Sequence, residues 1–111
     1  MARLGRLDRE VLLVVFLDAD RCYIADEVVW VGGHHLLHSR YRVLIQRALD
    51  KRAASLLLVH NHPSGDPRPS RADIAFTRAF HALTRTLEIG LCDHLVVTRS
   101  AAFSILLGKC V

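Results

Sequence analysis

The chain alternates short, uninterrupted apolar runs with longer segments whose apolar residues recur at helical spacing. Aliphatic and β-branched runs of this kind indicate strands, and the helical period indicates amphipathic helices. Helices that cross between strands predict an α/β fold with a mixed β-sheet flanked by helices. The expected order is strand, strand, helix, strand, helix, strand, strand, over Val11–Leu17, Cys22–Val31, Ser39–Arg52, Ser55–Val59, Ser70–Leu87, Leu91–Val97 and Phe103–Leu107.

Length and cysteine content limit the class of protein. A chain of 111 residues, of which 51% are hydrophobic, can bury a core as a single domain. No run approaches the roughly 20 apolar residues that span a bilayer, so we expect no membrane partner. The three cysteines are far apart and form no C-x-x-C pair, which favours free thiols in the cytoplasm.

The balance of charge is basic, with fifteen Lys and Arg against eleven Asp and Glu and a net charge of +4. A basic chain can bind nucleic acid. The arginines, however, are scattered singly and in pairs rather than gathered in a stripe that follows a phosphate backbone. A solvated surface is therefore the favoured interpretation, and a nucleic-acid partner stays open as the alternative.

Two histidines and an aspartate have the spacing of a metal site. His60 and His62 end an apolar strand, so their side chains point to the same face. Asp73 lies one turn inside the helix that Ser70 opens, after a loop stiffened by all three prolines of the chain. Two His and one carboxylate fill three zinc positions at about 2.0–2.2 Å and leave the fourth to water, as in catalytic sites.

A hydrolytic zinc site also needs a group that moves a proton. A carboxylate beside the metal can take the proton of the attacking water and pass it to a leaving amine. Asp26 and Glu27, in the second strand, are the candidates. We expect His94, behind Asp93, to be a packed strand residue or a partner of a ligand rather than a ligand itself.

These residues resemble a known motif. His60-x-His62, with Ser70 and Asp73 at their spacing, resembles the JAMM metal motif of JAB/MPN-domain proteins. The wider run HNHPSGDP that begins at His60 is similar to the RadC branch of that family. The resemblance covers nearly the whole chain, through Glu27–Val28, Arg47–Leu49 and Asp93–Val97.

The resemblance implies a zinc-dependent peptidase or isopeptidase with a cytidine-deaminase-like JAB/MPN fold. His60, His62 and Asp73 match the ligands of one Zn²⁺ per chain. Glu27 matches the catalytic glutamate in preference to Asp26, and Ser70 matches the serine that steadies the oxyanion.

The resemblance also bears on domain organisation and partners. We expect one RadC-like domain over residues 1–111, without the helix-hairpin-helix region that usually precedes it in RadC proteins. The expected substrate is a protein or peptide, such as one with a ubiquitin-like tail, and a homodimer is compatible with the resemblance.

Several alternatives stay open. Ser70-x-x-Asp73 is also the pattern of a capping box, and Ser70 can serve both purposes. His34 and His38 have the spacing of a competing metal pair on a helix, although the preceding Gly32-Gly33 favours a loop. A purely structural zinc would need a fourth ligand, for which Cys22, Cys92 and Cys110 are the candidates.

A non-catalytic module associated with DNA repair or mobile elements is the rival function.

Overall fold

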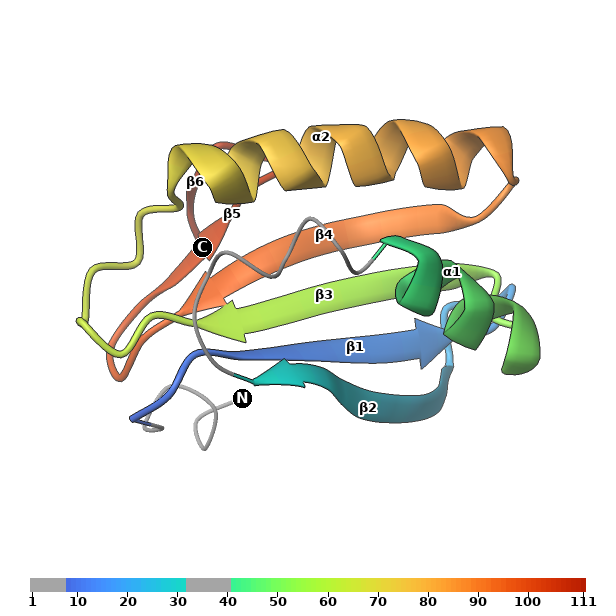
Figure 1. Ribbon diagram of the computed structural model, residues 1–111, viewed down its shortest axis with the longest axis horizontal. Helices are drawn as coiled ribbons and strands as arrows, with labels where there is room; N and C mark the ends of the chain where they lie inside the picture. Colours follow the sequence, from blue (N-terminus) through green and yellow to red (C-terminus); the bar gives the residue numbers. More distant parts are fainter. Residues whose placement is uncertain (1–7, 32–40) are drawn as a thin grey trace.

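The computed structural model describes residues 8–31 and 41–111, in which the strands form one mixed sheet and two helices pack against it (Figure 1). The strand order in the six-stranded sheet is β2-β1-β3-β4-β5-β6. The elements are β1 (Val11–Leu17), β2 (Tyr23–Val31), α1 (Tyr41–Asp50), β3 (Ser55–Asn61), α2 (Arg71–Thr86), β4 (Gly90–Val97), β5 (Ala102–Ser104) and β6 (Lys109–Cys110). This confirms the predicted α/β class and mixed sheet.

β1 and β2 form an antiparallel hairpin closed by a polar turn. The Asp18 carboxylate accepts hydrogen bonds from the backbone N–H groups of Asp20 at 2.8 Å and Cys22 at 2.9 Å. Arg21 adopts a left-handed conformation with φ 60°. The short carboxylate of Asp18 thereby supplies the acceptor that a tight turn needs.

β3 lies inside the sheet, antiparallel to β1 on one side and parallel to β4 on the other. Parallel strands cannot be joined by a tight turn, and α2 provides the crossover between β3 and β4. In this arrangement His60 lies opposite Leu12 of β1 and Val96 of β4. The end of β3 is therefore held on both sides by neighbouring strands.

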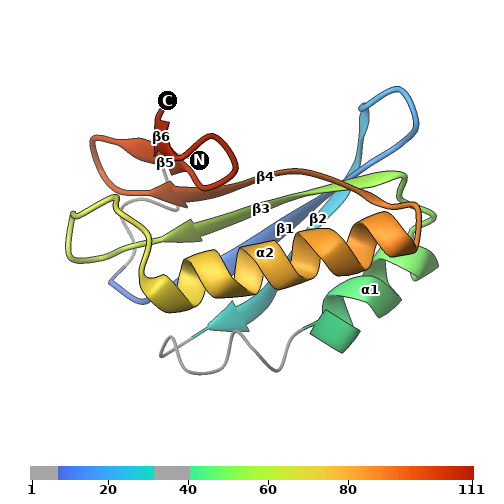
Figure 2. The same ribbon diagram turned by 90° about the horizontal axis from the view of Figure 1, so that it is seen from above.

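Both helices cover the same face of the sheet (Figures 1 and 2). The rings of Phe76 and Phe80 on α2 stack with centroids 5.6 Å apart, and Tyr41 of α1 stacks on Phe76 at 5.0 Å. In the described part of the chain, no helix has the length and apolar character needed to cross a membrane. The main core joins the helices to alternate residues of the strands, including Leu12, Val14, Phe16, Leu44, Ala48, Leu56, Leu58, Phe76 and Phe80.

One predicted strand differs from the structure. The run Phe103–Leu107 was expected to be extended, but β5 ends at Ser104 and a turn follows before β6. The Ser104 hydroxyl accepts a hydrogen bond from the Leu107 N–H at 3.0 Å, and Gly108 takes a left-handed φ of 72°. Asp93 accepts from the Ser104 hydroxyl at 2.5 Å and from the Leu106 N–H at 3.3 Å. These polar contacts fold an apolar run into a turn.

Phe76→Ala should test how far this core carries the fold. Phe76 is fully buried and stacks on two other rings, so the truncation leaves a cavity between α1, α2 and the sheet. We expect the free energy of unfolding to fall by about 3–5 kcal/mol, measured by urea denaturation. Leu49→Ala, at a side chain 62% exposed on α1, is the control and should cost under about 1 kcal/mol. Equal losses in the two variants would contradict the position of the core.

Candidate metal centre

The two histidines at the end of β3 point to the helix-covered side of the sheet. His60 continues the inward series of Leu56 and Leu58, and His62 follows two residues later. The His62 N–H donates to the Val97 carbonyl at 2.9 Å, which continues the β3–β4 pairing past the end of the strand. The Nε2 atoms of the two rings lie 3.0 Å apart, so both present the same nitrogen to one point.

Asp73 reaches these nitrogens from the first turn of α2. Ser70 caps the helix through a reciprocal capping box, which confirms that alternative from the sequence. The Ser70 N–H donates to Asp73 Oδ2 at 2.8 Å, and the same oxygen lies 3.5 Å from His60 Nε2 and 3.3 Å from His62 Nε2. Asp73 Oδ1 is buried and has no hydrogen-bond partner. The carboxylate is therefore held in place by its own helix and faces both imidazoles.

Glu10 joins the group from the residue before β1. Because Leu12 pairs with His60, the side chain two positions earlier lies on the same face, close to His62. Its Oε1 is 3.6 Å from His60 Nε2 and 3.7 Å from His62 Nε2. One ligand-type atom from each of Glu10, His60, His62 and Asp73 lies within 4.8 Å of every other. Glu10 was not among the site residues predicted from the sequence, because its local signal is merely an acidic residue directly before an apolar strand.

Asn61 fixes the backbone on both sides of Glu10. Its side chain points to the opposite face from the two histidines, where its amide donates to the Arg9 carbonyl at 2.6 Å. Its carbonyl oxygen accepts from the Val11 N–H at 2.7 Å. Asn61 is completely buried. The middle residue of the His-Asn-His tripeptide therefore connects the two histidines to the segment that carries the glutamate.

The donor set fits a zinc ion. Two ligands at about 2.0–2.1 Å from a tetrahedral zinc lie roughly 3.3 Å from each other. The contacts among the His60 and His62 nitrogens and Asp73 Oδ2 span 3.0–3.5 Å. The unpartnered Asp73 Oδ1 is a buried anionic oxygen, which is costly unless a cation compensates it. The group contains no cysteine, so the described residues offer no thiolate to close a structural zinc site.

Hydrogen bonds on the outer side of the rings orient both histidines. His62 Nδ1 lies 3.0 Å from the Asp66 carbonyl oxygen, which can only accept, so this nitrogen carries the proton. The Nε2 lone pair of His62 is then free to bind a cation. His60 Nδ1 lies 2.6 Å from His94 Nε2, and His94 is completely buried. This confirms that His94 is a packed strand residue in contact with one of the candidate ligands.

Burial and neighbouring groups shift the pKa values of the residues at this site. Burial raises the pKa of the Asp73 carboxyl, but the close contacts with the His60 and His62 rings outweigh it and hold this pKa well below its usual range. Burial lowers the pKa of His62, whereas contact with Asp73, with the Asp66 backbone and with Glu10 raises it overall. Burial is also the largest of the effects that hold the pKa of His94 well below its usual range. Asp73 is therefore an anion and His94 a neutral imidazole.

The structure does not bring Glu27 to this group. Its carboxylate lies 3.6 Å from Arg47 Nε and 3.6 Å from Lys51 Nζ, beside α1. Glu27 lies on β2, which is one strand further from β3 than β1 is. There it pairs with Val14, two residues after the Leu12 that faces His60. Its neighbour Asp26 accepts a hydrogen bond from the Tyr23 hydroxyl at 2.6 Å. Of the acidic residues considered for the proton transfer, neither lies beside the histidines, and Glu10 takes that position.

Ser70 opens onto a cleft beside the group. The cleft has a volume of about 380 Å³ and is lined by Glu10, His62, Pro63, Ser64 and Ser70. The Ser70 hydroxyl oxygen accepts from the Asp73 N–H at 3.0 Å, and the structure records no hydrogen bond donated by this hydroxyl to a described residue. Its proton is therefore available to a molecule in the cleft. His34 and His38, the competing metal pair weighed from the sequence, lie outside the described residues.

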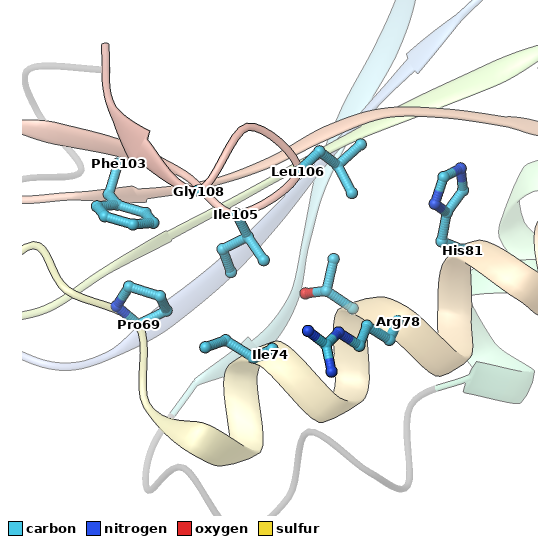
Figure 3. A pocket seen from close by; sticks show the side chains of 9 residues that line it. Pro69, Ile74, Arg78, His81, Phe103, Ile105, Leu106 and Gly108 are labelled. Atoms are coloured by element: carbon cyan, nitrogen blue, oxygen red, sulfur yellow. The ribbon is translucent and has the colours of Figure 1, made fainter.

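A second pocket of about 390 Å³ lies between α2 and the turn after β5 (Figure 3). Ile74, Arg78 and His81 of α2 face Phe103, Ile105 and Leu106 across it (Figure 3). None of the four ligand-type residues lines this pocket. Thr77, also part of its wall, contacts the buried ring of His94 through its hydroxyl group.

Comparisons with known proteins show the family of this chain. A family model described as "RadC-like JAB domain" matches residues 1–109. A UPF0758 protein from Leptothrix cholodnii is 41% identical over 102 residues, which is 92% of this chain and 46% of that protein. The chain thus spans about half the length of the curated relative that it matches.

Asn61→Ala should measure how firmly the Glu10 segment is held. The substitution removes both hydrogen bonds to the backbone around Glu10 and leaves buried groups without partners. We expect a loss of about 1–3 kcal/mol in the free energy of unfolding, measured by urea denaturation with a chelator present. Ser64→Ala removes an exposed loop hydroxyl that accepts from Asp66 and should change stability by less than about 0.5 kcal/mol. An Asn61 variant as stable as the Ser64 variant would contradict this role.

Proposed function

Because the chain belongs to the RadC-like JAB family, we propose that it is a zinc-dependent hydrolase that cleaves a peptide or isopeptide bond. The observation that carries the proposal is the convergence of His60 Nε2, His62 Nε2 and Asp73 Oδ2, with the Glu10 carboxylate beside them. His60, His62 and Asp73 would hold the zinc. Two histidines and one carboxylate leave a coordination position open, which is typical of catalytic sites.

Zinc in such a site lowers the pKa of water toward ~7 and polarises a carbonyl group as a Lewis acid. The residues around it supply orientation and proton transfer. His62 is oriented by the Asp66 carbonyl and Asp73 by the Ser70 N–H, so neither side chain has to rearrange to bind a cation. Such pre-orientation of ligands is worth about 10–100-fold in affinity or activity at known metal sites.

Glu10 is the proposed general base and acid. Its side chain is 14% exposed and lines the cleft, so it can contact both a water molecule and a substrate there. A carboxylate in this position can accept the proton of the attacking water and return it to the departing nitrogen. This assigns to Glu10 the role that the family resemblance had given to Glu27.

Ser70 is the proposed donor to the carbonyl oxygen of the substrate. Its hydroxyl oxygen accepts from the Asp73 N–H, which leaves the hydroxyl proton able to donate to a substrate. A hydroxyl donor near the reacting carbonyl stabilises the negative charge that develops on oxygen as water attacks. The capping role and the catalytic role of Ser70 use different parts of the same hydroxyl and do not compete.

A protein or peptide is the proposed substrate, and the cytoplasm the proposed compartment. The cleft beside Glu10, His62 and Ser70 has a volume within the range of about 300–1,000 Å³ that is usual for small-molecule sites. An exposed rim formed by Pro63 and Ser64 leaves it open to a chain that lies across it. These features favour an extended segment over a compact ligand enclosed on all sides.

Metal content tests the ligand assignment. We expect about one zinc per chain in wild-type protein after dialysis without chelator, measured by mass spectrometry of the metal. His62→Ala removes a ligand and Asp73→Asn replaces the anionic carboxylate by a neutral amide, so each should reduce the zinc content to a small fraction of that value. His81→Ala, which changes a histidine outside the group, is the matched control and should keep the full content. A folded wild type without zinc, even after zinc is added, would contradict the proposal.

Glu10→Gln and Glu27→Gln together decide which glutamate acts in catalysis. Cleavage would be measured on a library of internally quenched peptides that includes lysine-linked isopeptides. We expect Glu10→Gln to retain zinc and to lose roughly 10²–10⁴-fold in kcat, because the amide cannot transfer the proton. Glu27→Gln should cleave at the wild-type rate, since it loses only partly exposed ion pairs with Arg47 and Lys51. The reverse result would return the role to Glu27.

A further inference from the structure

A chain of buried polar contacts leads away from His60 into the core. His60 Nδ1 lies 2.6 Å from His94 Nε2, and His94 Nδ1 lies 2.6 Å from the Thr77 hydroxyl oxygen. The Thr77 hydroxyl lies 2.8 Å from the backbone carbonyl oxygen of Asp73. His60, His94 and Thr77 are each at most 1% exposed. This hydrogen-bond chain begins at one candidate zinc ligand, His60, and ends on the backbone of another, Asp73.

The direction of the hydrogen bonds in this chain follows from its far end. The Asp73 carbonyl has no proton, so the Thr77 hydroxyl must donate to it, and Thr77 has only one proton to give. The Thr77 oxygen therefore accepts from His94, whose proton must be on Nδ1. A neutral imidazole carries one ring proton, which leaves His94 Nε2 bare.

The same logic then fixes His60. Because His94 Nε2 is bare, it accepts from His60 Nδ1, which must carry the proton of that ring. The Nε2 atom of His60, which faces His62 and Asp73, is left with its lone pair free. With the opposite direction, His60 would carry its proton on Nε2, where it blocks binding of a cation.

We propose that Thr77 and His94 are positioning residues that hold His60 in the tautomer that binds zinc through Nε2. The inference rests on the proposed zinc site and extends it to two residues that touch neither metal nor substrate. His62 obtains the same tautomer from the Asp66 carbonyl in an exposed loop, whereas His60 obtains it through two buried side chains. The Asp73 carbonyl thereby couples the position of one ligand to the protonation of another.

The helix that carries Thr77 also supplies a matched control. Thr84 is another buried threonine of α2, completely covered, and its hydroxyl donates to the His81 carbonyl at 3.0 Å. Within the described residues, the Thr84 hydroxyl makes no hydrogen bond to a histidine ring. Thr77→Val and Thr84→Val therefore make the same chemical change at equally buried sites, and only the first breaks the chain to His60.

Zinc affinity is the first measurement, by competition with a chromophoric chelator for wild type, Thr77→Val, Thr77→Ser and Thr84→Val. We expect Thr77→Val to bind zinc roughly 10–100-fold more weakly, the usual cost of removing a partner of a metal-binding histidine. Thr77→Ser keeps the hydroxyl, and Thr84→Val keeps the hydrogen-bond chain to His60, so both variants should bind zinc as tightly as wild type. Equal affinities of Thr77→Val and Thr84→Val would overturn the inference and leave the zinc site intact. A wild type that binds no zinc would overturn both proposals.

The ring protons of wild-type protein give a second measurement that does not depend on any variant. Nitrogen-15 NMR of the histidine rings distinguishes a protonated from a bare nitrogen. We expect His60 and His94 each to carry a proton on Nδ1, with and without zinc. A bare Nδ1 on His60 in folded protein would overturn the inference, including in the case where Thr77→Val does not fold.

Discussion

The site depends first on the antiparallel register of β1 and β3, in which Leu12 lies opposite His60. This pairing places Glu10 beside the two histidines on the helix-covered face. A shift of one residue would turn the glutamate to the opposite face, because successive side chains alternate across a strand. Two features hold the register. Alternate apolar residues of β1 are buried under the helices, and the Asn61 side chain makes hydrogen bonds to the backbone on both sides of Glu10.

A second constraint is the concentration of charge and imidazole at one end of an apolar core. Asp73 is 1% exposed, yet one of its oxygens has no hydrogen-bond partner. Burying an ionised carboxylate is unfavourable unless charge and hydrogen bonds compensate for it. The same side chain caps α2, so the helix cannot place its N-terminus without bringing this charge to the histidines. The fold therefore maintains a site that favours a cation.

The sequence predicts a feature well when the residues that form it are close together along the chain, and poorly when they are far apart. His60, His62, Ser70 and Asp73 lie within one strand, loop and helix start, and local spacing brings them together. The position of Glu10 depends on which strand pairs with β3 and in what register, which periodicity does not specify. The turn after Ser104 was missed for a similar reason, because its partner Asp93 lies on another strand.

The proline-rich loop between His62 and Ser70 also affects the unfolded chain. Prolines favour extended backbone, so they keep His62 and Asp73 apart when the sheet and helix are absent. In the folded protein the loop reverses through a left-handed Gly65, whose N–H donates to the His62 carbonyl at 3.1 Å. At the proposed zinc site, an ion that needs both side chains would thus have little affinity for the disordered chain. Nearly all of its binding free energy would then add to the stability of the folded state, which would link metal supply to protein lifetime.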